Sequence, residues 1–295
     1  MARLLGTIAS SMLNVTPDVW SYGADTTADF GYCGAASVGD VFYIMGGATD
    51  ANHAYNVVTD TWSAKANIPS SRDALNSAAV GTTIYAIGNY LTGTDNTAYD
   101  TVNNTWSSKA AMTTGRSYLT VAASGTKVYA IGGYNGSLLA TNEEYDTVAN
   151  TWSSKASKTT AGAGISAGAH AGVIYCVGGS QPGGGASNER TTNNQAYNTS
   201  NNTWSTKTAI TVDKSVGGAG MVNGVLYYFG GTSNNGPIYS TAHYAYNVAS
   251  DTWSAKATMP NPKASAQAAV VGTKIIYASG DPGGTAAKKT FIYQT

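Results

Sequence analysis

Short apolar runs recur along the chain, and each is bounded by residues that form turns. In the segment from residue 72 to 109, the apolar run 84–87 follows the turn signal Gly81-Thr82 and closes at Gly88. Four or five apolar residues between turn signals are typical of a strand buried on both faces. Small or alternating residues on either side add three more candidate strands. The segment therefore predicts four short strands, a to d in chain order, joined by hairpins.

This four-strand pattern repeats at a nearly constant step. Six Trp-Ser pairs mark strand d, and their tryptophans are spaced 42, 44, 46, 52 and 49 residues apart: Trp20, Trp62, Trp106, Trp152, Trp204 and Trp253. The glycine that closes strand b keeps almost the same step: Gly46, Gly88, Gly132, Gly178, Gly230 and Gly280. Repeats of this period indicate stacked or radial units, and four-stranded sheets around an axis form a propeller.

The repeated unit resembles the kelch repeat. Each unit begins with an apolar residue, Tyr, two further residues and a Gly-Gly pair. A Tyr-Asp or Tyr-Asn pair follows, and the tryptophan of a Thr-Trp pair stands seven residues after the tyrosine of that pair. One copy has Tyr43, Gly46, Tyr55 and Trp62 at these positions. The resemblance covers residues 17 to 295, although Asn89 and Asp281 replace the second glycine in two copies. It implies an all-β, six-bladed kelch-type propeller.

The two ends of the chain predict how the ring closes. After Gly280 the sequence reaches Tyr293 and stops without a tryptophan seven residues later, whereas Trp20 has no glycine unit before it. We therefore expect residues 17–22 to supply strand d to a blade whose strands a to c come from the C-terminus. Residues 17–295 then form one propeller, and residues 1–16 lie outside it.

Composition excludes several classes of function. The 16 basic and 16 acidic residues balance to a formal net charge of zero, whereas nucleic-acid binding needs clustered Lys and Arg. No stretch approaches the roughly 18 apolar residues of a membrane-spanning helix. The two cysteines, Cys33 and Cys176, fall in predicted inner strands of different blades, where we expect buried core residues rather than a disulfide or a metal pair.

Loop lengths indicate which face carries function. The a–b turns are tight and the c–d turns are fixed, but the b–c loops between the glycine pair and the strand-c tyrosine hold from 7 to 17 residues. In a four-stranded antiparallel blade the b–c and d–a connections share one face. Variable loops on a rigid scaffold are where binding usually resides. We expect the functional face to be that of the b–c loops, although loop length can also drift neutrally.

Basic residues recur on this face, thirteen residues before the strand-b tyrosine: Arg72, Arg116, Lys214 and, with one extra hairpin residue, Lys263. The kelch resemblance implies a place near the mouth of the central channel, and such residues could attract a carboxylate, a sulfate or an acidic glycan. The alternative is that they bond main-chain carbonyls or neighbouring aspartates around the ring. Tyr90 and Tyr134, just after the glycines, could stack on a sugar or simply anchor their loops.

No catalytic set stands out, so we expect no enzyme activity, no metal and no cofactor. The three histidines, His53, His170 and His243, lie in different blades without zinc or triad spacing. Neither cysteine resembles the crosslinked site of kelch-like copper-radical oxidases, and the Asp-box of sialidases is missing. A kelch-like sugar mutarotase would need an Arg and Glu pair in the channel, and Glu occurs only at positions 143, 144 and 189.

Residues 1–16 suggest where the protein is attached. The segment from Leu4 to Ser11, with Leu5 and Ile8, resembles N-terminal segments of tailed-phage structural proteins; a short signal peptide is the alternative. A short apolar arm could dock into a neighbouring subunit as an added strand. We therefore predict a virion structural or adhesion protein, attached to other virion proteins by the arm, that binds a host glycan or a neighbouring virion protein. The alternatives are a cellular or secreted module that binds an acidic peptide, and a sugar-processing enzyme.

Overall fold

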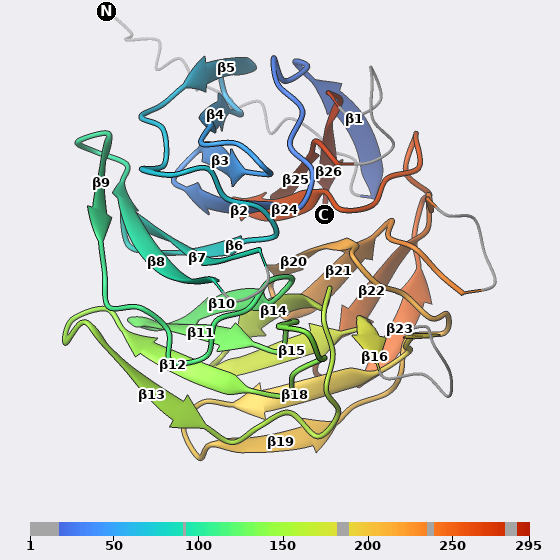
Figure 1. Ribbon diagram of the computed structural model, residues 1–295. Coiled ribbons are helices and arrows are strands. Elements are labelled where there is room, and N and C mark those ends of the chain that lie inside the picture. The colour runs from blue at the N-terminus through green and yellow to red at the C-terminus, as the bar shows by residue number, and fades with distance from the viewer. Residues whose placement is uncertain (1–17, 91–92, 182–188, 235–238, 281–287) are drawn as a thin grey trace, which may run out of the picture.

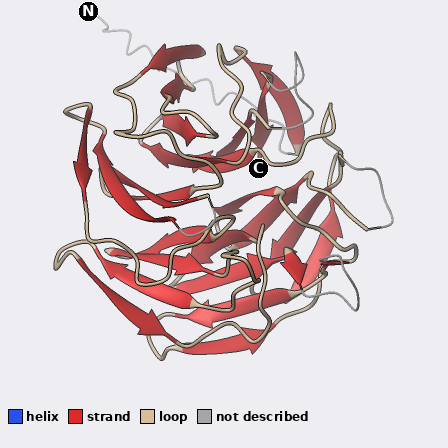
Figure 2. Ribbon diagram, viewed as in Figure 1, coloured by secondary structure: helices blue, strands red, loops and turns tan. Residues whose placement is uncertain are grey.

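The computed structural model describes residues 18–90, 93–181, 189–234, 239–280 and 288–295. These residues form strands, turns and loops, with no helix among them (Figure 2). Six four-stranded antiparallel sheets stand around a central axis as the blades of a propeller (Figure 1). The first strands of neighbouring blades contact one another all the way around, β2 with β6 and finally β24 with β2. The predicted six-bladed propeller is confirmed.

Blades 1 to 3 are continuous in sequence. Blade 1 holds β2 (Cys33–Val38), β3 (Val41–Gly46), β4 (Asn52–Asn56) and β5 (Thr61–Ala64). Blade 2 holds β6 (Asn76–Val80), β7 (Thr83–Asn89), β8 (Gly93–Asp100) and β9 (Thr105–Ser108). Blade 3 holds β10 (Thr120–Ser124), β11 (Lys127–Ile131), β12 (Asn142–Asp146) and β13 (Thr151–Lys155).

Blade 4 carries an extra hairpin, and blade 6 joins the two ends of the described chain. Blade 4 holds β14 (Ser166–His170), β15 (Val173–Val177), β18 (Asn194–Asn198) and β19 (Thr203–Thr206), with the hairpin β16 (Ser180–Gln181) and β17 (Glu189–Arg190) between its middle strands. Blade 5 holds β20 (Gly218–Val222), β21 (Val225–Phe229), β22 (His243–Asn247) and β23 (Thr252–Ala255). Blade 6 holds β24 (Gln267–Val271), β25 (Lys274–Ala278), β26 (Thr290–Gln294) and β1 (Val19–Gly23).

Ring closure follows the prediction from the misplaced first tryptophan. β1 pairs antiparallel with β26, with Trp20 opposite Tyr293. The other blades repeat this register within one chain segment, for example with Trp152 opposite Tyr145. The described strand d covers residues 19–23, one residue beyond the predicted end, and residue 17 lies outside the described residues.

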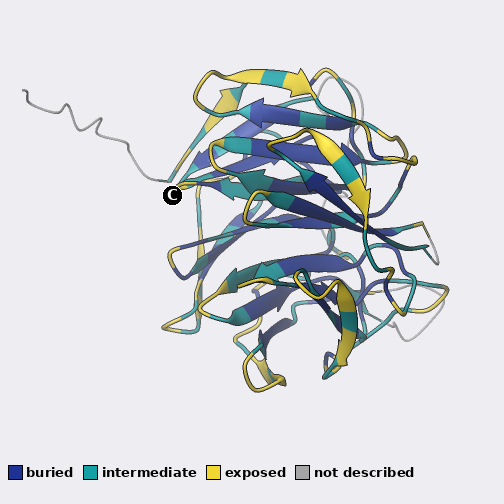
Figure 3. Cartoon of the chain, turned by 90° about the vertical axis from the view of Figure 1, so that its left-hand side faces the viewer, coloured by how far each residue is buried: buried dark blue, intermediate teal, exposed yellow. Residues whose placement is uncertain are grey.

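The hydrophobic core is divided among the joints between blades. Each of the six apolar clusters among the described residues combines side chains of two neighbouring blades; one joins Tyr85 and Ile87 of blade 2 to Val128 and Tyr145 of blade 3. The second strand of each blade, such as β7, is almost entirely buried, and the outermost strands, such as β5, are the most exposed (Figure 3). Both cysteines are free and buried, as expected. Stability therefore depends on blade-to-blade contact.

The repeated tryptophan clamps each blade to the one before it. Trp152 Nε1 in blade 3 donates a hydrogen bond of 2.7 Å to Ala110 O, just after the last strand of blade 2. Ala110 N–H donates in return to Asn150 Oδ1 in blade 3, at 2.8 Å. The carbonyl also accepts from Asn96 Nδ2 of its own blade, at 3.1 Å. The indole bond recurs at every joint, on Ala24, Ala66, Ala156, Thr208 and Ala257.

The glycine that closes strand b allows neighbouring blades to approach closely. Gly178 has φ 66°, and a Cβ added there would lie 2.4 Å from Lys214 O. The next residue, Gly179, donates its N–H to that same carbonyl at 2.7 Å. A side chain at position 178 would therefore force the blades apart at the channel rim.

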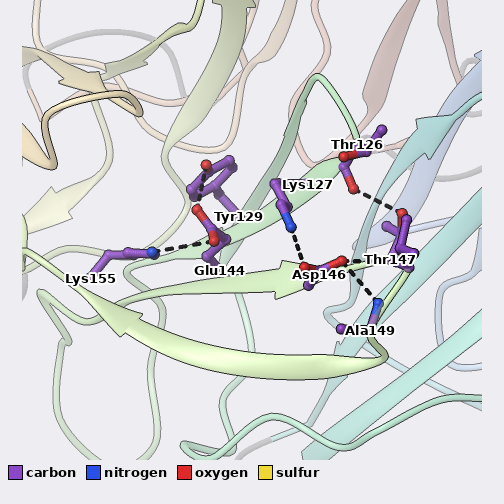
Figure 4. Close-up of polar contacts among 9 residues, drawn as sticks. Thr126, Lys127, Tyr129, Glu144, Asp146, Thr147, Ala149 and Lys155 are labelled. Atoms are coloured by element: carbon purple, nitrogen blue, oxygen red, sulfur yellow. Dashed lines mark hydrogen bonds and ion pairs between the residues drawn. The ribbon is translucent and has the colours of Figure 1, made fainter.

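The disc has two different faces. The b–c and d–a connections meet on one, called the loop face, and the a–b and c–d turns meet on the other, called the turn face. The turn face is uniform because an Asp or Asn caps each c–d turn: Asp146 Oδ1 accepts the N–H groups of Val148 and Ala149 at 2.9 and 3.0 Å (Figure 4). Thr147 Oγ1 ties this turn to Thr126 O at 2.8 Å. These bonds explain the constant interval from Tyr to Trp.

Candidate functional site

The loop face is hollowed where the channel opens. A cavity of about 450 Å³, called the mouth, is lined only by residues of the d–a and b–c connections. Four tyrosines, one arginine and several hydroxyl residues are among them: Tyr32, Tyr118, Tyr134, Tyr239, Arg190, Ser180, Ser215, Thr232 and Ser265. The cavity has the size and the mixed lining of a small-molecule site. The mouth therefore lies on the face that loop lengths predicted to be functional.

The rim of the mouth is a ring of main-chain hydrogen bonds. In each blade, one of the two residues that precede strand a has a left-handed backbone: Tyr32, Ala74, Tyr118, Gly164, Val216 and Ser265. Five bonds of 2.9–3.2 Å join them in succession, from Ala74 O around to Tyr32 N. At the sixth position Ala74 N–H donates to Asp73 Oδ1 instead, at 2.8 Å. Non-glycine residues adopt this conformation only where the surrounding structure imposes it, so the rim is rigid.

Tyrosines form one wall of the mouth. The rings of Tyr32 and Tyr118 meet edge to face, with centroids 5.4 Å apart, and Ala74 stands between these two residues in the order of the rim. Tyr32 is 37% exposed, so part of its ring faces solvent. Burial raises the pKa of the Tyr118 hydroxyl, and nearby Asp73 adds to the effect. The Tyr118 hydroxyl therefore stays neutral near pH 7 and can donate a hydrogen bond.

Arg190 and hydroxyl groups line the other side of the mouth. Arg190 Nε donates to Thr232 Oγ1 at 3.1 Å, and Ser180 Oγ lies 3.3 Å from Ser215 Oγ. The main chain of Arg190 is held by Asn234, which accepts its N–H and donates to its carbonyl, both at 3.1 Å. The arginine is thus the one charged residue among the described residues that line the mouth.

The four predicted basic residues lie beneath the rim rather than in the mouth. Arg72, Arg116, Lys214 and Lys263 are at most 3% exposed. Arg116 donates to Ala130 O at 3.0 Å and pairs with the buried Glu143 at 2.7 Å, while Lys263 donates to Ser279 O at 2.7 Å. Arg72 likewise donates to Ala86 O, and Lys214 to Ser240 Oγ. The alternative, in which they bond carbonyls and neighbouring side chains, describes their contacts; they offer no surface to a ligand in this structure.

Of the two predicted aromatic residues, Tyr134 lines the mouth and Tyr90 does not. Tyr134 is half-buried and lines the mouth, and its main chain pairs with Ser117 in the d–a connection of the same blade. Tyr90 is 57% exposed and is not among the residues that line the mouth. The predicted arm residues Leu4, Leu5 and Ile8 lie outside the described residues.

None of the three glutamates is among the described residues that line the mouth. Glu143 is buried against Arg116, and Glu189 is exposed on β17. Glu144 accepts from the Tyr129 hydroxyl at 2.6 Å and pairs with Lys155 at 3.2 Å (Figure 4). In the described ranges no three His, Cys, Asp or Glu side chains group as a metal site, and no helix is long and apolar enough to span a membrane.

Below the mouth the channel narrows. A cavity of about 90 Å³ follows, with Ala35, Ser77, Val121 and Ala167 among its walls, and a third of about 290 Å³ opens on the turn face. Strand a of each blade supplies these walls, and its side chains are mostly small. A ligand larger than a few atoms that enters the mouth therefore cannot pass further down the channel.

Sequence reasoning missed most of the mouth residues. Tyr32 and Tyr118 stand two positions after Phe30 and Arg116. The repeat that identified the buried basic position therefore also contained these mouth tyrosines, two positions further along the chain. Arg190 lies in the longest b–c loop, outside every repeated motif of the sequence. Its proximity to Thr232 in blade 5 depends on how that loop folds back, which no repeat pattern encodes.

Comparisons with known proteins agree with this architecture. Residues 115–159 and 161–208, which contain the strands of blades 3 and 4, match the family model of the Kelch motif. No curated protein matches the sequence. Among solved structures, that of YjhT matches with a TM-score of 0.76 at 17% identity, over 92% of this chain and 95% of that chain. At this identity the similarity shows a shared fold.

Proposed function

We propose that this chain, a six-bladed β-propeller in which residues 115–159 and 161–208 match the Kelch motif, is a non-enzymatic binding module that binds a glycan in its mouth. The observation that carries the proposal is the cavity of about 450 Å³ lined by four tyrosines, an arginine and several hydroxyl side chains. Aromatic rings offer apolar faces to a sugar ring, and hydroxyl groups exchange hydrogen bonds with its hydroxyls.

The shape of the mouth favours a glycan over an extended peptide. Loops from several blades enclose the cavity, and the channel below narrows to about 90 Å³. An extended peptide needs a groove or a free strand edge. A compact sugar residue needs a concave site with a few placed polar groups, which the mouth supplies.

A glycan array with the purified protein tests this proposal, followed by calorimetry with the best binder. We expect Tyr118→Ala to weaken binding at least about tenfold, or about 1.4 kcal/mol. Tyr22→Ala is the matched control, because Tyr22 is a 54% exposed tyrosine on the outer strand β1 and does not line the mouth. An array without binders, or equal losses in the two variants, would contradict glycan binding at the mouth.

We further propose that the protein is a tail or particle-surface component of a virion and acts in adhesion. The two faces of the disc support this arrangement. Val19 pairs with Gln294 at the turn-face end of blade 6, so the described chain begins on the face opposite to the mouth. An arm bound to other virion proteins would leave the mouth directed outward.

Two observations test the virion hypothesis. Portal, capsid or tail genes beside the coding sequence would support it, and their absence would favour a cellular or secreted binding module. Deletion of residues 1–16 should leave a folded propeller, measured by circular dichroism, that no longer incorporates into particles. Normal incorporation of the shortened chain would refute the arm.

A further inference from the structure

The geometry points to Arg190 as the residue that makes the mouth select saccharides carrying an anionic group, a carboxylate above all. This inference rests on the proposed glycan function and adds the class of glycan. Arg190 lies on β17, whose pairing with β16 places it opposite Ser180. Both residues line the mouth. Since neighbouring side chains of a strand point to opposite faces, the adjacent Glu189 is directed away from Arg190.

The guanidinium is held in place while its outer nitrogens remain open. Nε donates to Thr232 Oγ1 at 3.1 Å, and two bonds to Asn234 fix the main chain. Asn234 N–H is in turn held by the Asp213 carboxylate. Within the described residues, neither Nη atom of Arg190 has a hydrogen bond or an ion pair. A planar fork oriented in advance loses little entropy when it binds an oxyanion with two parallel bonds.

The positive charge of Arg190 is not neutralised by a neighbour. None of the ion pairs among the described residues includes Arg190, whereas Arg72 and Arg116 both have acidic partners. No Asp or Glu is among the described residues that line the mouth. A single charge in a concave site with low-dielectric walls attracts the opposite charge more strongly than one on an open surface.

The two walls together define how the ligand lies. The Tyr32 and Tyr118 rings offer an apolar face on one side of the mouth, and Arg190 with Thr232 offers donors on the other. A sugar ring on the tyrosines then carries its anionic group toward Arg190. The remaining ring hydroxyls meet Ser180, Ser215 and Ser265.

Matched sugar pairs test this inference by NMR titration of the full-length protein. Methyl glucuronide is compared with methyl glucoside, and methyl galacturonide with methyl galactoside, with glucose 6-sulfate as a second anion. We expect at least one anionic sugar to bind about tenfold tighter than its neutral partner. Arg190→Gln should abolish this preference while binding of the neutral sugar persists, and Arg190→Lys should restore part of it. Unchanged melting temperatures would show that both variants fold.

The outcomes separate the inference from the proposed function. Equal binding of neutral and anionic sugars, or a preference that survives in Arg190→Gln, would overturn the role of Arg190 and leave glycan binding intact. Tyr118→Ala should weaken both members of a pair by a similar factor. Failure of every sugar in the panel and of the glycan array would remove the proposed function and this inference together.

Discussion

Acidification from pH 7 to pH 4 is expected to destabilise the joint between blades 5 and 6 through His243. This histidine takes the place of the buried asparagines of blades 1 to 4, and its Nδ1 lies 3.1 Å from Ala257 O, the carbonyl that also accepts from Trp20. Because a carbonyl oxygen can only accept a hydrogen bond, Nδ1 carries the proton. Nε2 is buried without a partner among the described residues. A second proton would therefore place an unpaired charge in the core.

Burial lowers the pKa of His243 to about 4, with smaller opposing effects from the hydrogen bond with the Ala257 carbonyl and from Asp18. The unfolded chain has a histidine pKa of about 6.5. Between these values the unfolded state binds the additional proton and the folded state does not, so stability falls as the pH falls through this window. At about 1.36 kcal/mol per pKa unit, the loss amounts to roughly 3 kcal/mol by pH 4.

Equilibrium urea unfolding at several pH values between 7 and 4, followed by circular dichroism, measures this loss. His243→Asn is the matched variant, because Asn52, Asn96, Asn142 and Asn194 donate through Nδ2 to the equivalent carbonyls. We expect the variant to fold and to lose most of the pH dependence in this window. Parallel loss of stability in both proteins would refute the assignment to His243.

Three further predictions concern the repeated contacts. Trp152→Phe should lower the free energy of unfolding by about 0.5–1.5 kcal/mol, because Ala110 O keeps its bond from Asn96; a loss above about 3 kcal/mol in urea would show that the indole does more than clamp. Gly178→Ala should cost about 1 kcal/mol or more, since the added Cβ would lie 2.4 Å from Lys214 O, and an unchanged melting temperature would contradict this. Burial raises the pKa of Cys33 and Cys176 to about 12, so iodoacetamide should modify them only after unfolding; mass spectrometry of labelled native protein would expose an error.

The fold was largely predictable from sequence because each blade repeats the same contacts. Trp-Ser marks an outer strand whose indole must reach the preceding blade, and the glycine after strand b must admit a neighbouring carbonyl. Trp20 could be assigned to the last blade because it has no strands a to c before it, and the last blade is the one repeat that lacks its tryptophan. Periodicity therefore encodes both the blade count and the closure.

The site was less predictable because it depends on side-chain direction. The position of Arg116 in the repeat is clear, but nothing in the sequence says that its guanidinium turns inward to Ala130 O and Glu143. His243 gave no signal either, since its role is to replace an asparagine. Arg190 is held at the mouth by a contact with Thr232 of blade 5. Contacts between irregular loops do not repeat from blade to blade, so the sequence repeat does not reveal them.

Closure by β1 sets a waiting time during synthesis. The partner of Trp20 is Tyr293, about 270 residues later, and at about 5–20 residues per second the ribosome needs roughly 15 to 55 s to supply it. Throughout that interval the first strand has no sheet to join. When β26 emerges, it presents an unpaired edge that β1 of another nascent chain fits equally well. We therefore expect crowded polysomes to favour strand-exchanged dimers and dilute expression to favour the closed monomer.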